Sequence, residues 1–176
     1  MKDYNILNGK RILIVDDEAD VLDTLMELLP MCNVTKAKTF QHAKELLETR
    51  DQDLAILDIM GVDGYELLKI ANERKTLAII LTAHAFSPEN TIRAYQKGAA
   101  FFVPKENLVD ITEFMSYVFS AKEKGGNSWS NWLESFEPIY EVKFGPSWKE
   151  SDSEFWDAIA KRDWRLASVL RGQGEP

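Results

Sequence analysis

Residues 11–18 read RILIVDDE, a short run of mostly β-branched and apolar residues that ends in three consecutive carboxylates. Such a run is typical of a strand buried on both faces of a parallel sheet. Polar residues directly after a strand of this kind lie at the carboxyl edge of the sheet, where open α/β sheets bind ligands. The stretch therefore predicts both a fold class and the edge at which to look for a site.

The residues that follow alternate between helical and strand-like patterns. Apolar residues recur at helical spacing in 19–29, 39–49, 65–74, 88–97 and 107–122, and strand-like runs occupy 34–38, 54–57, 77–81 and 100–103. The run 34–38 is the most polar, so we expect it at a sheet edge. Five strands that alternate with five helices indicate an α/β fold, in which a parallel sheet is covered by helices on both faces.

Polar side chains follow four of these strands. Asp16, Asp17 and Glu18 come after the first, Asp58 after the third, Thr82 after the fourth and Lys105 after the fifth. Carboxylates gathered at one edge repel each other unless a cation lies between them, and hard oxygen ligands suit Mg²⁺. A lysine and a hydroxyl at the same place can stabilise phosphoryl oxygens. Together these residues predict a Mg²⁺-dependent phosphoryl site.

Four motifs resemble the receiver domain of two-component response regulators, the CheY-like family. They are Val15-Asp16-Asp17-Glu18, Leu57-Asp58-Ile59-Met60, Leu81-Thr82-Ala83 and Val103-Pro104-Lys105. The match covers about residues 8–124 in the family's order and spacing. The resemblance implies a doubly wound, flavodoxin-like sheet of order 2-1-3-4-5. It also implies a phosphoprotein of a phosphorelay that is not an enzyme in the usual sense, although it catalyses its own phosphorylation and dephosphorylation.

The resemblance also implies which residues take part in phosphorylation. Asp58 would be the phospho-acceptor, attacking the phosphohistidine of a histidine kinase or of a phosphotransfer protein. Asp17 would bind Mg²⁺ directly and Asp16 largely through water, with Asp58 and the backbone carbonyl of Met60 as further ligands.

Three more residues take roles from the same resemblance. Thr82 would contact the phosphoryl group, Lys105 would pair with it, and Phe102 would be the aromatic switch, a role that its position three residues before Lys105 favours over plain core. The chain departs from the family in two places: the loop 58–64 is about two residues shorter, and Glu106 stands where a proline usually follows the lysine.

Composition narrows the possible partners and compartment. The 176 residues carry 21 Lys+Arg against 29 Asp+Glu, a net charge of −8, so nothing in the overall charge attracts nucleic acid or anionic lipid. A single cysteine, Cys32, excludes an intrachain disulfide and a cysteine-based zinc site. The N-terminus lacks a signal-peptide pattern, and no apolar run approaches the roughly 20 residues that cross a bilayer. We therefore expect a cytoplasmic protein with no membrane contact.

The composition changes after the turn-favouring residues 125–127, which predicts a receiver domain over 1–124 and an acidic helical extension over 125–176. All five tryptophans lie in the extension: Trp129, Trp132, Trp148, Trp156 and Trp164. Ser128 is expected to cap a helix that Pro138 interrupts. Ser151 and Glu154 form a capping-box pattern, which predicts one helix to about residue 170.

The extension leaves two interpretations open. The leading one is a small aromatic core that docks on the receiver and signals through protein contacts, with a homodimer also open. The alternative is a transcription regulator or scaffold in which the extension binds DNA or a multiprotein partner. The extension carries 6 Lys+Arg and 9 Asp+Glu, a net charge of −3, which argues against nucleic acid.

Overall fold

The computed structural model describes residues 4–171, and a parallel five-stranded sheet lies at the centre of these residues. The strand order is β2-β1-β3-β4-β5, which confirms the predicted α/β fold. The strands are β1 (Arg11–Val15), β2 (Asn33–Ala37), β3 (Leu54–Asp58), β4 (Leu77–Thr82) and β5 (Phe101–Pro104). The helices are η1 (Asn5–Leu7), α1 (Ala19–Leu28), α2 (Phe40–Thr49), α3 (Gly64–Glu73), α4 (Pro88–Gln96), η2 (Lys105–Asp110), α5 (Ile111–Glu123), α6 (Trp129–Phe144), η3 (Glu150–Asp152), α7 (Ser153–Ala160) and α8 (Trp164–Arg171).

The register of the central strands brings their carboxyl ends level. Val15 pairs with Leu57, and Asp58 pairs with Leu81. The residue after Val15 and the residue after Leu81, which is Thr82, therefore lie on either side of Asp58. The more polar β2 stands at one edge of the sheet, as its sequence predicts. The order of the strands thus places the predicted polar residues at one edge.

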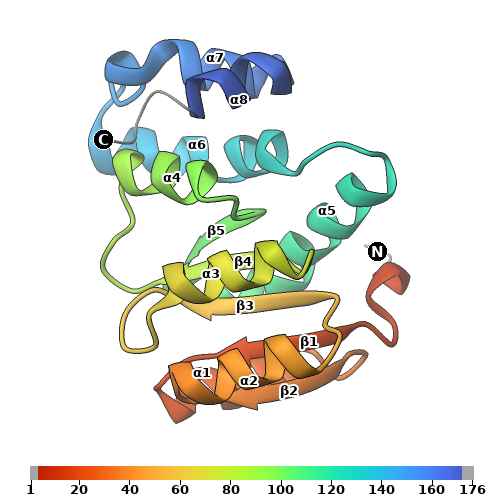
Figure 1. The fold of residues 1–176 in the computed structure, drawn as a ribbon. Helices are drawn as coiled ribbons and strands as arrows, with labels where there is room; N and C mark the ends of the chain where they lie inside the picture. Colours follow the sequence, from red (N-terminus) through yellow and green to blue (C-terminus); the bar gives the residue numbers. More distant parts are fainter. Residues whose placement is uncertain (1–3, 172–176) are drawn as a thin grey trace.

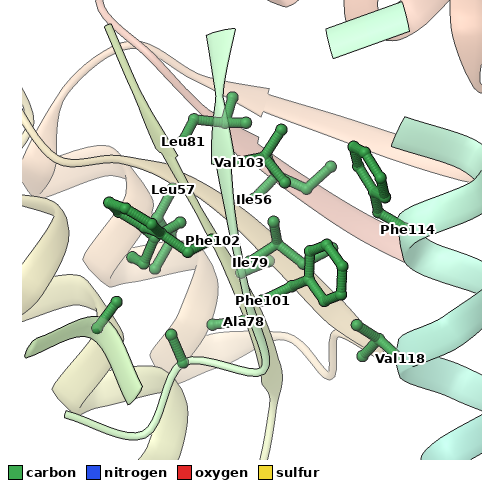
Figure 2. Close-up of a cluster of buried hydrophobic side chains, with 14 of the residues drawn as sticks. Ile56, Leu57, Ala78, Ile79, Leu81, Phe101, Phe102, Val103, Phe114 and Val118 are labelled. Atoms are coloured by element: carbon green, nitrogen blue, oxygen red, sulfur yellow. The ribbon is translucent and has the colours of Figure 1, made fainter. Parts of the chain in front are cut away.

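Two phenylalanines of β5 join the sheet to the layers on either side of it. Phe101 and Phe102 are fully buried and point to opposite sides of the strand, as neighbouring strand residues do. Figure 2 shows Phe101 directed toward α5, where it stacks on Phe114 with ring centroids 5.1 Å apart. Phe102 stacks on Phe86, in the segment between β4 and α4, at 5.7 Å. Both faces of β5 are therefore closed by aromatic side chains.

The C-terminal helices pack against α4 and β5. Figure 1 shows α6, α7 and α8 beyond α4, on the side of the molecule away from β2. Trp129 and Trp132 of α6 donate their indole N–H groups to the backbone carbonyls of Ala99 and Phe102, at 2.9 and 2.7 Å. The tryptophans of α6 thus combine burial with directed hydrogen bonds to β5 and the residues just before it. No helix in the described part of the chain has the length and apolar character to cross a membrane.

The expected interruption at Pro138 is wrong. Helix α6 runs through this residue to Phe144, although proline lacks the amide that would donate to the carbonyl of Glu134. Phe136 and Tyr140, one turn apart on either side of the proline, are both fully buried, so packing of this face outweighs one lost hydrogen bond. Ser128 does not cap the helix with its side chain; its hydroxyl donates to the carbonyl of Ala100 instead.

Two other helix predictions also need correction. The single helix expected from Ser151 to residue 170 is divided into α7 and α8, because Arg162 takes a left-handed conformation with a φ of 56°. Asp163 precedes the second helix, and its carboxylate caps it by accepting from the backbone N–H of Leu166. The helix expected over 107–122 begins later, since residues 105–110 form the 3-10 helix η2 before α5.

Candidate functional site

The site lies at the carboxyl ends of β1, β3 and β5, and its centre is a lysine among carboxylates. Lys105 follows β5, and its Nζ lies 2.8 Å from Asp16 Oδ2 and 3.2 Å from Asp58 Oδ1. The contact with Asp16 Oδ2 is an ion pair without the geometry of a hydrogen bond. Both aspartates are buried and the lysine side chain is only 13% exposed. Three residues predicted from separate motifs therefore meet at one point.

A fourth carboxylate joins this group. Glu18 Oε1 lies 2.9 Å from Lys105 Nζ, and the backbone N–H of Glu18 donates to Asp16 Oδ1 at 2.9 Å. Glu18 belongs to the acidic run predicted at this edge, but the sequence assigned it no specific role. Its place in the acidic run was the available clue, since the turn after β1 brings the third carboxylate back toward the sheet edge.

The charges at this edge are unbalanced. Burial raises the pKa of Asp58 to about 6, and the neighbouring Asp16 adds to the shift, while Lys105 opposes it. Burial likewise raises the pKa of Asp16. Burial lowers the pKa of Lys105, but its close contacts and charge interactions with Asp16, Glu18 and Asp58 outweigh this and raise it overall. One lysine is therefore shared by more negative charge than it can neutralise.

The acidic run also supplies the oxygens of a hard-cation site. Ligand oxygens of Asp16, Asp17 and Glu18 lie within 4.8 Å of one another. Gly61 approaches this run so closely that a Cβ at its position would collide with the Asp17 carboxylate, and its φ of 83° also favours glycine. An all-oxygen donor set beside excess negative charge fits Mg²⁺ better than a softer metal.

The remaining predicted residues take different positions around the centre. Thr82 is buried at the end of β4, and its hydroxyl oxygen accepts from the backbone N–H of Ala85 at 2.9 Å. Phe102 is fully buried in β5, and Met60, in the loop after β3, is 65% exposed. Phe86, which stacks on Phe102, received no role from the sequence, because nothing local distinguishes it from a surface loop residue.

Comparisons with known proteins agree with this geometry. The family model of the response regulator receiver domain matches residues 12–116. The chain is 30% identical over 129 residues to the two-component response regulator ARR12 of Arabidopsis thaliana, an alignment that covers 68% of this chain and 22% of that protein. It is 33% identical over 104 residues to the phosphate regulon transcriptional regulatory protein PhoB of Pseudomonas aeruginosa, covering 55% of this chain and 45% of that protein.

A solved structure gives the same result for the fold. The structure of a CheY-like response regulator receiver domain protein from Methanospirillum hungatei JF-1 superposes with a TM-score of 0.60 at 31% identity. The superposition covers 68% of this chain and all of that one. The chain spans less than half the length of the two curated relatives named above, and their likeness to it therefore concerns this part of each protein alone.

Proposed function

Because the chain belongs to the response regulator receiver domain family through residues 12–116, we propose that it is a phosphorylation-dependent response regulator of a two-component phosphorelay. A histidine kinase or a phosphotransfer protein would donate the phosphoryl group, and Asp58 would accept it. The observation that carries this proposal is the buried Asp58 carboxylate, 3.2 Å from Lys105 Nζ and beside a second buried aspartate.

The chemistry follows from this arrangement. One carboxylate oxygen of Asp58 attacks the phosphorus of a phosphohistidine; the new O–P bond forms as the P–N bond breaks, and the electron pair of that bond leaves with the imidazole nitrogen. With a pKa of about 6, Asp58 is mostly ionised at pH 7, so the nucleophile is available. Lys105 stays protonated and pairs with a phosphoryl oxygen, and the buried Thr82 hydroxyl donates to another.

Receiver domains bind Mg²⁺, and the acidic run of this chain fits the ion. Asp16, Asp17 and Asp58 would hold it together with the backbone carbonyl of Met60. When bound, Mg²⁺ neutralises charge on the phosphoryl oxygens and offsets the repulsion between the carboxylates. The side chains of the site orient the incoming group: Lys105 contacts Asp58 directly, and β4, which pairs with β3, brings Thr82 beside it.

We further propose a receiver domain over residues 1–124 and an extension over 125–176 that transmits the signal through protein contacts. The packing of α6 on β5 supports a role that depends on the receiver. DNA binding by the extension stays an alternative prediction. A mobility-shift experiment at low salt, with and without a phosphodonor, separates the two, because binding to a phosphate backbone is strongest there.

Phosphorylation with acetyl phosphate and Mg²⁺, followed by intact mass, tests the acceptor. Wild-type protein should gain one phosphoryl group that alkaline hydroxylamine removes, and Asp58→Asn should gain none. Asp63→Asn is the matched control, since Asp63 is an exposed carboxylate in the same loop. Equal labelling of Asp58→Asn and wild type would refute the assignment.

A further inference from the structure

The segment between β4 and α4, residues 83–87, connects the site to the C-terminal helices. At its beginning, the Thr82 hydroxyl accepts from the backbone N–H of Ala85, so the position of this side chain fixes the start of the segment. At its end, the Ser87 hydroxyl accepts from Asn90 N–H and opens α4. A residue of the site and the first turn of α4 are therefore held by the same short piece of backbone.

A tyrosine of α6 holds the far end of this segment. The Tyr140 hydroxyl is hydrogen-bonded to Thr91 Oγ1 and lies 3.3 Å from the carbonyl oxygen of Ser87. Thr91 in turn donates to the same Ser87 carbonyl at 2.7 Å. Tyr140 and Thr91 are both fully buried, so no water replaces these bonds when they break. We call this arrangement the Tyr140 latch.

Phe86 fills the space between the two ends. Its ring centroid lies 5.7 Å from that of Phe102, 4.8 Å from that of Tyr140 and 5.6 Å from that of Phe136. Its side chain is thus enclosed by β5 on one side and by α6 on the other. Because packed interiors change between discrete arrangements and do not deform continuously, a shift of Phe86 requires α6 to repack.

From these contacts we infer that the Tyr140 latch couples phosphorylation of Asp58 to the packing of α6, an inference that rests on the proposed function. When Thr82 turns its hydroxyl toward a phosphoryl group on Asp58, the Ala85 amide loses its acceptor and the segment shifts. Phe86 is then displaced from between its aromatic neighbours. The Tyr140 latch holds the segment and α6 together and opposes this displacement. When phosphorylation displaces the segment, the latch breaks and the packing of α6 loosens.

The coupling must also act in the opposite direction. Two events that are linked in free energy affect each other by the same factor. Weakening the Tyr140 latch therefore makes the phosphorylated arrangement easier to reach. Tyr140 acts on the site through Phe86 and the 83–87 segment, which makes it a positioning residue and not a catalytic one.

Binding of beryllofluoride, a phosphoryl mimic, tests this in the full chain with Mg²⁺, by calorimetry. Tyr140→Phe removes only the hydroxyl, and we expect it to bind the mimic about threefold to tenfold more tightly, the effect of one hydrogen bond of ordinary strength. Tyr117→Phe is the matched control, because the Tyr117 hydroxyl bonds to Glu113 within α5 and does not touch the segment. We expect its affinity to equal that of wild type.

Hydrogen exchange of the α6 amides supplies a second readout. A defect confined to the site would leave these exchange rates unchanged. The mimic should speed exchange of α6 amides in wild type, whereas in Tyr140→Phe these amides should exchange fast before it is added. Thr91→Val breaks the same latch from α4 and should reproduce both effects if Tyr140→Phe folds poorly. The double variant Tyr140→Phe/Thr91→Val should bind the mimic and exchange its α6 amides much as each single variant does, because both substitutions remove the same interaction.

The outcomes separate this inference from the function it rests on. If wild type binds beryllofluoride and Asp58→Asn does not, while folded Tyr140→Phe and Thr91→Val bind it as tightly as wild type, the latch is refuted and the acceptor assignment stands. If Asp58→Asn binds the mimic as tightly as wild type, or if wild type does not bind it, both proposals fail.

Discussion

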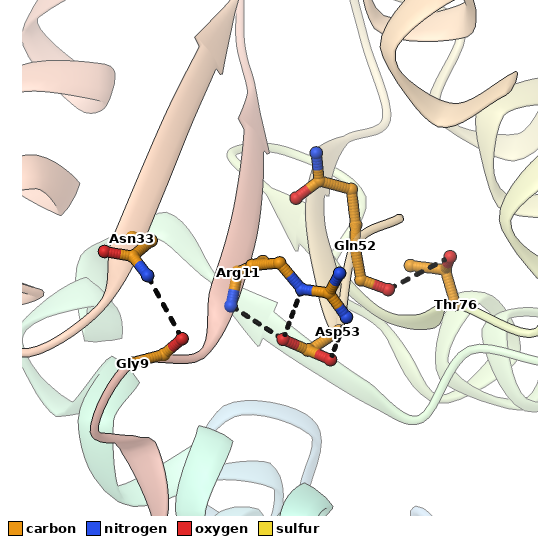
Figure 3. Close-up of polar contacts among 6 residues, drawn as sticks. All are labelled: Gly9, Arg11, Asn33, Gln52, Asp53 and Thr76. Atoms are coloured by element: carbon orange, nitrogen blue, oxygen red, sulfur yellow. Dashed lines mark hydrogen bonds and ion pairs between the residues drawn. The ribbon is translucent and has the colours of Figure 1, made fainter. Parts of the chain in front are cut away.

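The two ends of the central sheet carry the same kinds of charged group in different proportions. At the amino end, Arg11 of β1 meets Asp53, just before β3, one to one. The guanidinium contacts both carboxylate oxygens at 3.0 and 3.1 Å, and the backbone N–H of Arg11 donates to Asp53 at 2.8 Å (Figure 3). At the carboxyl end, a single lysine faces three carboxylates.

The difference appears in the pKa values of two aspartates one strand length apart. The hydrogen bond from the Arg11 side chain lowers the pKa of Asp53, whereas burial and the nearby Asp16 raise the pKa of Asp58. The matched pair of Arg11 and Asp53 joins two strands, and its charges balance without a further ion. The cluster around Lys105 carries more negative than positive charge, and this excess lowers the stability of the fold. Strongly shifted pKa values of this kind are typical of functional sites, here one suited to a cation and to an anionic group.

Removing the lysine should have the largest effect on stability. Lys105→Met leaves Asp16 and Asp58 buried without a cation, and breaking a buried ion pair typically costs about 3–5 kcal/mol. We expect a loss of about 3 kcal/mol in urea unfolding at pH 7 with a chelator present. Lys36→Met is the control, since Lys36 and Asp23 form an exposed pair at 3.5 Å. Equal losses in the two variants would contradict the contrast between the charge clusters.

Neutralising Asp58 should have the opposite effect on stability and raise it. A pKa raised from 3.8 to about 6 means that the folded state binds the proton more tightly, so stability falls as pH rises through this window. Asp58→Asn removes this penalty, and we expect it to stabilise the metal-free protein by about 2 kcal/mol at pH 7. Added Mg²⁺ should then raise the melting temperature of wild type more than that of the variant. A destabilised Asp58→Asn would mean that Lys105 already balances the cluster.

The sequence was sufficient for this edge of the sheet because its signals are local. An apolar run followed by a carboxylate marks a strand end, and parallel strands bring their ends together, so Asp16, Asp58 and Lys105 could be placed from their neighbours alone. The N-caps of α2 and α4 follow an equally local rule: the side chains of Thr39 and Ser87 each accept from a backbone N–H three residues on.

The features that could not be predicted depend on packing between distant segments. Helix α6 passes Pro138 because Phe136 and Tyr140 bury a continuous face, which outweighs the local preference against proline. The break at Arg162 allows α7 and α8 to pack on each other. Phe86 and Tyr140 are separated by more than fifty residues, and no spacing rule connects them. The site was therefore more predictable than its connection to the rest of the chain.

Breaking the matched pair of Arg11 and Asp53 at the amino end should change stability least. Its dependence on pH should be opposite to that of Asp58. Asp53 has a lowered pKa, so its ionised form stabilises the fold above its ordinary value of 3.8, and this contribution is lost as pH falls through the folded value. The pair is partly exposed, which limits its worth to about 1 kcal/mol or less. Asp53→Asn should lose that amount at pH 7, and the loss should shrink as the pH falls through the folded pKa of Asp53. Stability followed from pH 7 to pH 2 in urea gives both signs in one experiment: the difference between wild type and Asp53→Asn closes as pH falls, and the advantage of Asp58→Asn over wild type closes too, at higher pH. If Asp53→Asn instead stabilised the protein at pH 7, the amino end would share the charge deficit of the carboxyl end, and the contrast between them would not identify the site.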